Sequence, residues 1–208
     1  GVSAVGSSTA LGSGDLSING VAIRASSSAD DTASTANAAA SAISKVAAIN
    51  ASSAETGVTA IVNTNTVAGT DMTAAAASGS ITINGTAISV TTTGDAASSR
   101  TAVVEAINAK SAQTGVTATD TGDDDKGVTL TAADGRNITT SFTTVSAAST
   151  GIAAAATYTG GYTLVADSDV STITVTGGDG TAGSNIANSG LAAGTYTAGT
   201  AATTSTAQ

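Results

Sequence analysis

The sequence has no cysteine, histidine, proline or tryptophan, and only 2% of its 208 residues are aromatic. Without cysteine there is no disulfide, no thiolate nucleophile and no sulfur-ligated zinc or iron–sulfur site. Without histidine, the chain lacks the side chain best suited to proton transfer near neutral pH, which is also the commonest metal ligand. These absences exclude catalytic triads that use histidine and every reaction that uses a cysteine nucleophile.

Bulky apolar residues and positive charges are also scarce. Leu, Ile, Val and Phe together make up about 17% of the chain, so its cores must be thin. Six Lys and Arg face 15 Asp and Glu, giving a net charge of -9, and this excludes the basic surface that nucleic acids require. No apolar run approaches the roughly 18 residues of a membrane span, and no secretory signal opens the chain. The start at Gly1, without a methionine, predicts a fragment or a processed product.

A short motif occurs twice. Residues 16–23 read L-S-I-N-G-V-A-I, and residues 81–88 read I-T-I-N-G-T-A-I. In both copies Asn-Gly separates two short segments of alternating apolar residues. Because Asn and Gly both tolerate positive φ, each copy predicts a β-hairpin with a two-residue type I′ turn.

An alanine-rich segment follows each hairpin and predicts a helix, over Asp30–Asn50 in the first copy and Asp95–Asn108 in the second. Asp or Ser at the start can cap each helix, and Gly57 and Gly115 fit left-handed C-cap positions. The first copy is longer by seven residues, about two helical turns. Apolar pairs at a spacing of three predict the buried stripe of each helix: Val46/Ile49 and Val104/Ile107.

Alternating strands, Val58–Asn63 and Val116–Thr121, complete the two copies. The sequence therefore predicts an α+β fold of two tandem ββαβ units, at residues 12–70 and 78–145. Strands on either side of 134–137 predict one more hairpin. The third part, 146–208, is rich in Thr, Ala and Gly; we expect it to be β structure that packs with residues 1–11, with strands at Tyr162–Val165 and Ser171–Thr176.

These residues resemble a known family. An I-N-G hairpin, an alanine-rich helix ending I-N-A (49–51 and 107–109) and then T-G-V-T-A (56–60 and 114–118) are similar to the hook IN motif of bacterial flagellins. The segments L-T-A-A-D-G-R-N-I (130–138) and Y-T-L-V (162–165) are similar to strands in the outer part of flagellins. The long terminal helices that build a flagellin filament core are missing from these 208 residues, which therefore resemble the central, surface-exposed region.

The resemblance implies a structural protein, not an enzyme, located outside the cell in the flagellum. Its partners would be other flagellin subunits in the full-length filament, and host antibodies could recognise it. We expect the isolated fragment to be monomeric, with no nucleic-acid or membrane partner. Two alternatives remain: a fragment of the filament cap or another hook-associated protein, and a secreted adhesin or glycan-binding module, although sugar sites usually stack aromatic rings, which are few here.

No residue is assigned a catalytic, cofactor-binding or metal-binding role. The dense carboxylate cluster at 120–127 has oxygen ligands of the kind that calcium prefers, but it lacks the final Glu of an EF-hand loop and predicts an exposed acidic turn. The run G-G-D-G at 177–180 is a single copy of a calcium-repeat step and predicts a turn. The pair Asp167/Asp169, and Lys110 with a serine, are the remaining catalytic candidates, but the chain has few bulky side chains to line a pocket around them.

Asparagine sequons and hydroxyl groups offer candidate glycosylation sites. Asn50, Asn84 and Asn137 each stand in an N-glycosylation sequon, a match that arises readily by chance in a threonine-rich chain. The resemblance to flagellins implies O-glycosylation on Ser and Thr. Exposed hydroxyl stretches such as Thr91–Thr93 and 203–206 are candidates for it, and solvated strand and loop is the alternative for both.

Overall fold

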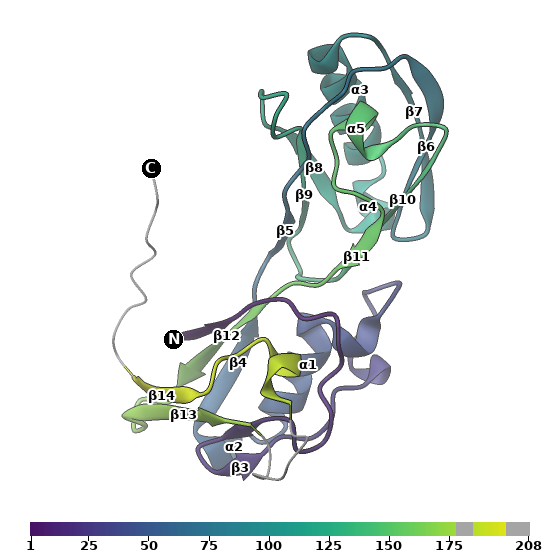
Figure 1. Ribbon diagram of the computed structural model, residues 1–208. Helices are drawn as coiled ribbons and strands as arrows, with labels where there is room; N and C mark the ends of the chain where they lie inside the picture. The colour runs from purple at the N-terminus through teal and green to yellow at the C-terminus, as the bar shows by residue number, and fades with distance from the viewer. Residues whose placement is uncertain (178–184, 199–208) are drawn as a thin grey trace. The chain divides into compact units, whose positions relative to one another are not determined.

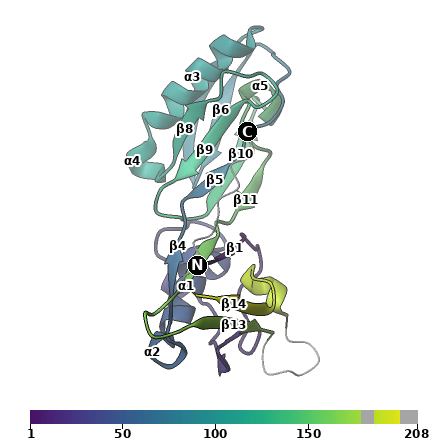
Figure 2. The same cartoon turned by 90° about the vertical axis from the view of Figure 1, so that its left-hand side faces the viewer.

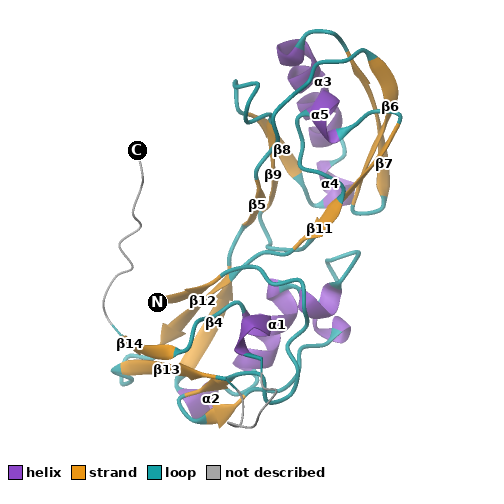
Figure 3. Cartoon of the chain, in the orientation of Figure 1, coloured by secondary structure: helices purple, strands orange, loops and turns teal. Residues whose placement is uncertain are grey.

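The computed structural model describes residues 1–177 and 185–198 (Figure 1). It contains both helices and strands, which confirms the predicted α+β class (Figure 3). The chain forms two compact units, and each has its own apolar core. Among the described residues, unit 1 comprises 1–32, 38–63, 160–177 and 185–198, and unit 2 comprises 33–37 and 64–159.

Unit 1 contains two antiparallel sheets, with strand orders β1-β12-β4 and β14-β13-β2-β3. The helix α1 packs against β4. Its elements, in chain order, are β1 (Val2–Ala4), β2 (Ser17–Ile18), β3 (Val21–Ala22), the 3₁₀ turns η1 (Ser28–Asp30) and η2 (Ala38–Ala40), α1 (Ala42–Asn50), α2 (Ser53–Thr56), β4 (Val58–Val62), β12 (Tyr162–Ala166), β13 (Thr172–Thr176), η3 (Ile186–Ser189) and β14 (Gly194–Thr197).

Unit 2 also contains two antiparallel sheets, with orders β5-β9-β8 and β11-β10-β6-β7. The helix α3 lies alongside these strands, against β7 and β8 (Figure 2). Its elements are β5 (Asn65–Val67), β6 (Ala77–Ile83), β7 (Thr86–Thr92), α3 (Ala96–Asn108), α4 (Ser111–Thr114), β8 (Thr117–Asp120), β9 (Val128–Ala132), β10 (Ile138–Thr143), α5 (Ala147–Thr150) and β11 (Ala156–Tyr158).

The two units share one topology, and the second is inserted into the first. The strands β1, β2, β3, β4, β12, β13 and β14 of unit 1 have the same neighbours as β5, β6, β7, β8, β9, β10 and β11 of unit 2. The registers also agree, because Leu164 pairs with Ala60 in unit 1 and Leu130 pairs with Ala118 in unit 2. In unit 1, the chain between β4 and β12 forms most of unit 2. The equivalent strands of unit 2, β8 and β9, are joined only by a loop.

This nesting changes the expected division into three segments at 12–70, 78–145 and 146–208. Residues 146–159 belong to unit 2, and the described residues after Gly160 complete unit 1, where β12 pairs with both β1 and β4. The repeated module is therefore larger than ββαβ, and its copies are nested instead of tandem. The physical reason is that a ββαβ piece leaves strand edges and an apolar face uncovered, and strands distant in sequence cover them.

Local signals in both copies are confirmed. Asn19 and Gly20 have φ of 49° and 82°, and Asn84 and Gly85 have φ of 48° and 80°, as a type I′ turn requires. The side chains of Ser41 and Asp95 accept from backbone N–H groups in the first turns of α1 and α3. The C-caps at residues 57 and 115 are left-handed glycines, as expected.

The predicted helix over Asp30–Asn50 is wrong in its first half. The α-helix begins at Ala42, and the stretch before it contains only the short 3₁₀ turn η2 in place of the expected α-helical turns. Residues 33–37 instead belong to unit 2, where Asn137 donates from its backbone N–H to Ser34 Oγ and from Nδ2 to the carbonyl of Ala36. Ser, Thr and Asp in this stretch favour turns over helix, and it lacks an apolar stripe to hold a helix on a core.

The predicted hairpin around 134–137 is also wrong. β9 and β10 flank this turn, but they lie in different sheets of unit 2 and do not pair with each other. β9 lies between β5 and β8, and β10 lies between β6 and β11. Alternating apolar residues on both sides of a turn indicate two strands but not their partners, which depend on the other strands available in the fold.

Candidate functional site

The asparagine of each Ile-Asn-Gly turn joins three parts of its unit. In unit 2, Asn84 N–H donates to the Thr139 carbonyl at 3.0 Å, Asn84 Oδ1 accepts from Thr139 N–H at 2.9 Å, and Asn84 Nδ2 donates to the Thr114 carbonyl at 2.9 Å. The side-chain amide thereby acts as an extra peptide group that pairs with β10 and holds the end of α4. Asn84 is 9% exposed, so these bonds form largely away from water.

Asn19 makes the same three bonds in unit 1. Its backbone N–H donates to Thr174 O at 2.8 Å, its Oδ1 accepts from Thr174 N–H at 2.8 Å, and its Nδ2 donates to Thr56 O at 2.8 Å. We call each set an asparagine clamp. The clamps give a structural reason for asparagine in this motif, since it tolerates positive φ and has both a donor and an acceptor.

The asparagine that ends each long helix pairs with the strand that follows it. Asn50 Oδ1 accepts from Ala60 N–H at 2.7 Å, and its Nδ2 donates to the Ala60 carbonyl at 3.0 Å. Asn108 makes the same two bonds to Ala118, at 2.7 and 3.0 Å. These side chains therefore occupy part of the outer edges of β4 and β8, and the I-N-A and T-G-V-T-A parts of the motif act together.

Two of the carboxylates in the acidic cluster at 120–127 bind Arg100. Arg100 is 4% exposed; its Nε lies 2.7 Å from Asp120 Oδ1, and its Nη1 contacts Asp124 Oδ1. Asp123 Oδ2 lies 3.3 Å from Lys126 Nζ, and the N–H of Asp125 lowers the pKa of Asp123 by donating to its carboxylate. Nearby cations therefore already neutralise part of this loop. Among the described residues, no three carboxylates come together as a metal site.

Calcium is expected to leave the melting temperature of the chain unchanged. A calcium ion at this loop would have to displace the Arg100 guanidinium from Asp120 and Asp124, and the exchange leaves a buried positive charge without a partner. Differential scanning calorimetry with millimolar calcium, and with magnesium as a control for general ionic effects, measures this. An upward shift with calcium alone would establish a metal site, because a ligand that binds only the folded state raises its stability.

The catalytic candidates all lie in exposed positions. Asp167 and Asp169 are exposed in the turn between β12 and β13, beside a hollow of about 360 Å³ that Ala166, Ser168, Val170, Ser171 and Ala198 also line. The lining contains no cation and no aromatic residue. Lys110 is exposed at the start of α4. The hollow therefore supplies no dry wall for a reaction.

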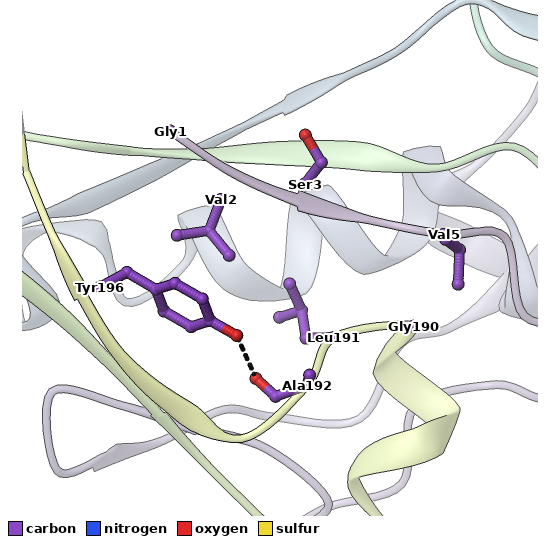
Figure 4. Close-up of a pocket in the computed structure, with 8 residues that line it drawn as sticks. All are labelled: Gly1, Val2, Ser3, Val5, Gly190, Leu191, Ala192 and Tyr196. Carbon is purple, nitrogen blue, oxygen red and sulfur yellow. Dashed lines mark hydrogen bonds between the residues drawn. The ribbon is translucent and has the colours of Figure 1, made fainter. Parts of the chain in front are cut away.

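A second hollow, of about 570 Å³, lies in unit 1 beside β1 and β14 (Figure 4). Its side chains are mostly apolar, with Val2, Leu191 and Tyr196 around it. The Tyr196 hydroxyl donates to the Ala192 carbonyl at 2.9 Å. No carboxylate, lysine or arginine side chain lines this hollow.

The modification candidates fall into three groups. The side-chain amide nitrogens of all three sequon asparagines donate to backbone carbonyls, and a glycan on any of them would replace one of the two N–H groups of that nitrogen. Thr91 and Thr93 are exposed, whereas Thr92 is 1% exposed and its hydroxyl donates to the Ala75 carbonyl. The stretch 203–206 and most of the G-G-D-G turn at 177–180 lie outside the described residues.

The sequence reading missed a buried lysine. Lys45 of α1 is 2% exposed, its Nζ donates to the Ser7 carbonyl at 2.9 Å, and burial lowers its pKa to about 8. Superposing the two I-N-A helix ends places Lys45 at the position of Val103, which is fully buried in α3. This alignment with an apolar residue is the sequence signal that indicates a buried Lys45. It also corrects the predicted stripe of the second helix, in which Val103 is buried and Val104 is only half-buried.

Lys45→Met is expected to stabilise unit 1 at pH 7 by about 2–3 kcal/mol, since the folded chain would no longer hold a desolvated charge. In the unaltered chain, stability should rise from about pH 8 to 10.5, where the unfolded chain binds the Lys45 proton and the folded chain does not. Burial raises the pKa of Tyr162, which opposes this rise from pH 10.0 onward and should make stability fall above pH 10.5. Urea unfolding from pH 7 to 11 measures these trends.

The rise above pH 8 should disappear in Lys45→Met and persist in Lys110→Met, which removes an exposed lysine. An unchanged pH profile in Lys45→Met would contradict the assignment of this rise to Lys45.

Comparisons with known proteins do not assign a family. No protein-family model matches the sequence. No curated protein matches it either. Among the described residues, no helix is both long and apolar enough to cross a membrane.

Proposed function

We propose that this chain is the surface-exposed outer part of a bacterial flagellin, a structural subunit of the flagellar filament that catalyses no reaction. The observation that carries the proposal is the twofold motif. In both copies, the I-N-G part provides the turn and the clamp asparagine. The I-N-A part ends the helix and binds the next strand, and the T-G-V-T-A part provides the glycine cap. The motif therefore works as one structural module in each unit, and this supports the proposal.

The nested arrangement suits an outer region. The N-terminal strand β1 and the C-terminal strand β14 both belong to unit 1, and unit 2 is inserted into it. A filament core that continues from both ends of unit 1 would carry the two units as a single insertion. Neighbouring subunits would be the main partners, the location would be extracellular, and exposed threonines such as Thr91 and Thr93 would be available to antibodies or to O-glycosylation.

The composition also supports folding after export. The chain has no proline, so slow prolyl isomerisation cannot delay folding, and it has no cysteine to pair. Apart from residues 33–37, unit 2 is continuous in sequence, so it can form while unit 1 is incomplete. Unit 1 must wait for β12 to reach β4 across the inserted unit, which makes it the later step.

Immunogold electron microscopy of the source bacterium tests the proposal. Antibodies raised against the purified 208-residue chain are expected to label flagellar filaments along their whole length, and cells that lack the gene should show no label. Label confined to filament tips would favour the cap protein, and label on the cell body without filaments would overturn the proposal. In that last case, a glycan array with a specific ligand would identify an adhesin or glycan-binding module.

A further inference from the structure

Both clamp asparagines precede glycine, as Asn19-Gly20 and Asn84-Gly85. In such a pair, the backbone nitrogen of the glycine can attack Cγ of the asparagine side chain. A new C–N bond closes a five-membered succinimide, and ammonia leaves from Cγ. Water then opens the ring to aspartate or isoaspartate. Glycine has no Cβ to hinder this approach, so Asn-Gly is the pair in which the reaction is easiest.

The folded units hold both asparagines away from this reaction. Each side chain is fixed at both ends, with Oδ1 bound to a strand N–H and Nδ2 bound to a threonine carbonyl. To close the ring, Cγ must turn back toward the glycine nitrogen of its own turn. That rotation breaks both side-chain bonds and, in unit 2, leaves the N–H of the half-buried Thr139 and the carbonyl of the buried Thr114 without these partners.

We infer that Asn19 and Asn84 are conformation-gated deamidation sites, which are protected in the folded units and react when the chain is unfolded. In the net reaction, the asparagine amide and one water give a carboxylate and ammonium, since the ammonia that leaves takes up the proton of the new acid. The product cannot rebuild the clamp. An aspartate places a carboxylate oxygen against the carbonyl of Thr56 or Thr114, where the amide had donated, and isoaspartate also adds a backbone atom to a two-residue turn.

The inference does not depend on the flagellar proposal, because it concerns the folding of the chain itself. It implies that the fraction of Asn19 and Asn84 converted to aspartate or isoaspartate increases with the time that the chain spends unfolded. A chain that stays unfolded at mildly alkaline pH loses the ability to refold, whereas a chain that folds promptly keeps both asparagines.

Peptide mass spectrometry tests the inference. The 208-residue chain is incubated in folding buffer and in concentrated guanidinium chloride, at the same mildly alkaline pH and temperature. In denaturant, the peptides that contain Asn19 and Asn84 should gain the mass change of amide-to-acid conversion, and in folding buffer they should convert at least about tenfold more slowly. Asn50 and Asn108 precede alanine and serve as internal controls, which should convert more slowly than the Asn-Gly pairs in denaturant.

After the denaturant is removed, the amplitude of the native thermal transition should fall in proportion to the converted fraction. Equal conversion in folding buffer and denaturant would overturn the gating. Full conversion with an unchanged transition would overturn the effect on folding. The variant Asn84→Asp checks the second step separately, since it should melt below the unaltered chain without any incubation.

Discussion

Asn84→Ala is expected to destabilise unit 2 by about 3–7 kcal/mol, a large fraction of the 5–15 kcal/mol that stabilises a typical domain. The substitution leaves Thr139 N–H and the Thr114 carbonyl without the partners that the side chain supplied, and each such loss costs about 1–3 kcal/mol where the group is buried. Alanine also adopts φ near +48° with difficulty, which adds about 1 kcal/mol. Urea unfolding measures the total, and hydrogen exchange of β6 and β10 locates it.

Asn84→Gly separates the two contributions. Glycine accepts the positive φ without strain but makes no side-chain bonds, so it should recover only about 1 kcal/mol of the loss. Asn19→Ala should produce the corresponding loss in unit 1, read from exchange of β2 and β13. A cost below about 1 kcal/mol for both alanine variants would show that the clamps do not stabilise the units.

Replacing residues 63–161 by residues 121–127 is expected to yield a folded, single-unit protein. The register supports this junction, because Val62 pairs with Tyr162 in unit 1 and Asp120 pairs with Val128 at the corresponding position of unit 2. The segment 121–127 therefore joins two strands with the geometry that β4 and β12 require. The unit 1 core, including Leu164 and Ile49, belongs entirely to residues that remain.

Circular dichroism and thermal unfolding measure the outcome, with one cooperative transition expected. A seven-residue Gly/Ser linker at the same junction is the matched control. It should also allow folding, with lower stability, because the flexible linker has more conformational freedom to lose. Failure of both versions to show a transition would mean that unit 1 needs unit 2 to fold and that the nesting is not a simple insertion.

Local features of this protein could be predicted from its sequence. The type I′ turns depend on two adjacent residues that tolerate positive φ, and the caps at Ser41, Asp95, Gly57 and Gly115 depend on groups within one helical turn. The repeat of the motif predicted that two copies of a unit exist. The short strands β5, β11 and β14 were missed, since three or four residues rich in Thr, Ala and Gly carry little periodic signal.

The sequence by itself determined the small repertoire of reactive groups, the α+β class and the two asparagine-centred hairpins, because these depend on composition and on neighbours along the chain. The tertiary structure alone decided that unit 2 is inserted between β4 and β12, that β9 and β10 join different sheets, that Lys45 is buried and that Arg100 binds the acidic loop. Each of these depends on which distant segment covers an open strand edge, an apolar face or a charge. That choice is made by the packing of the whole unit.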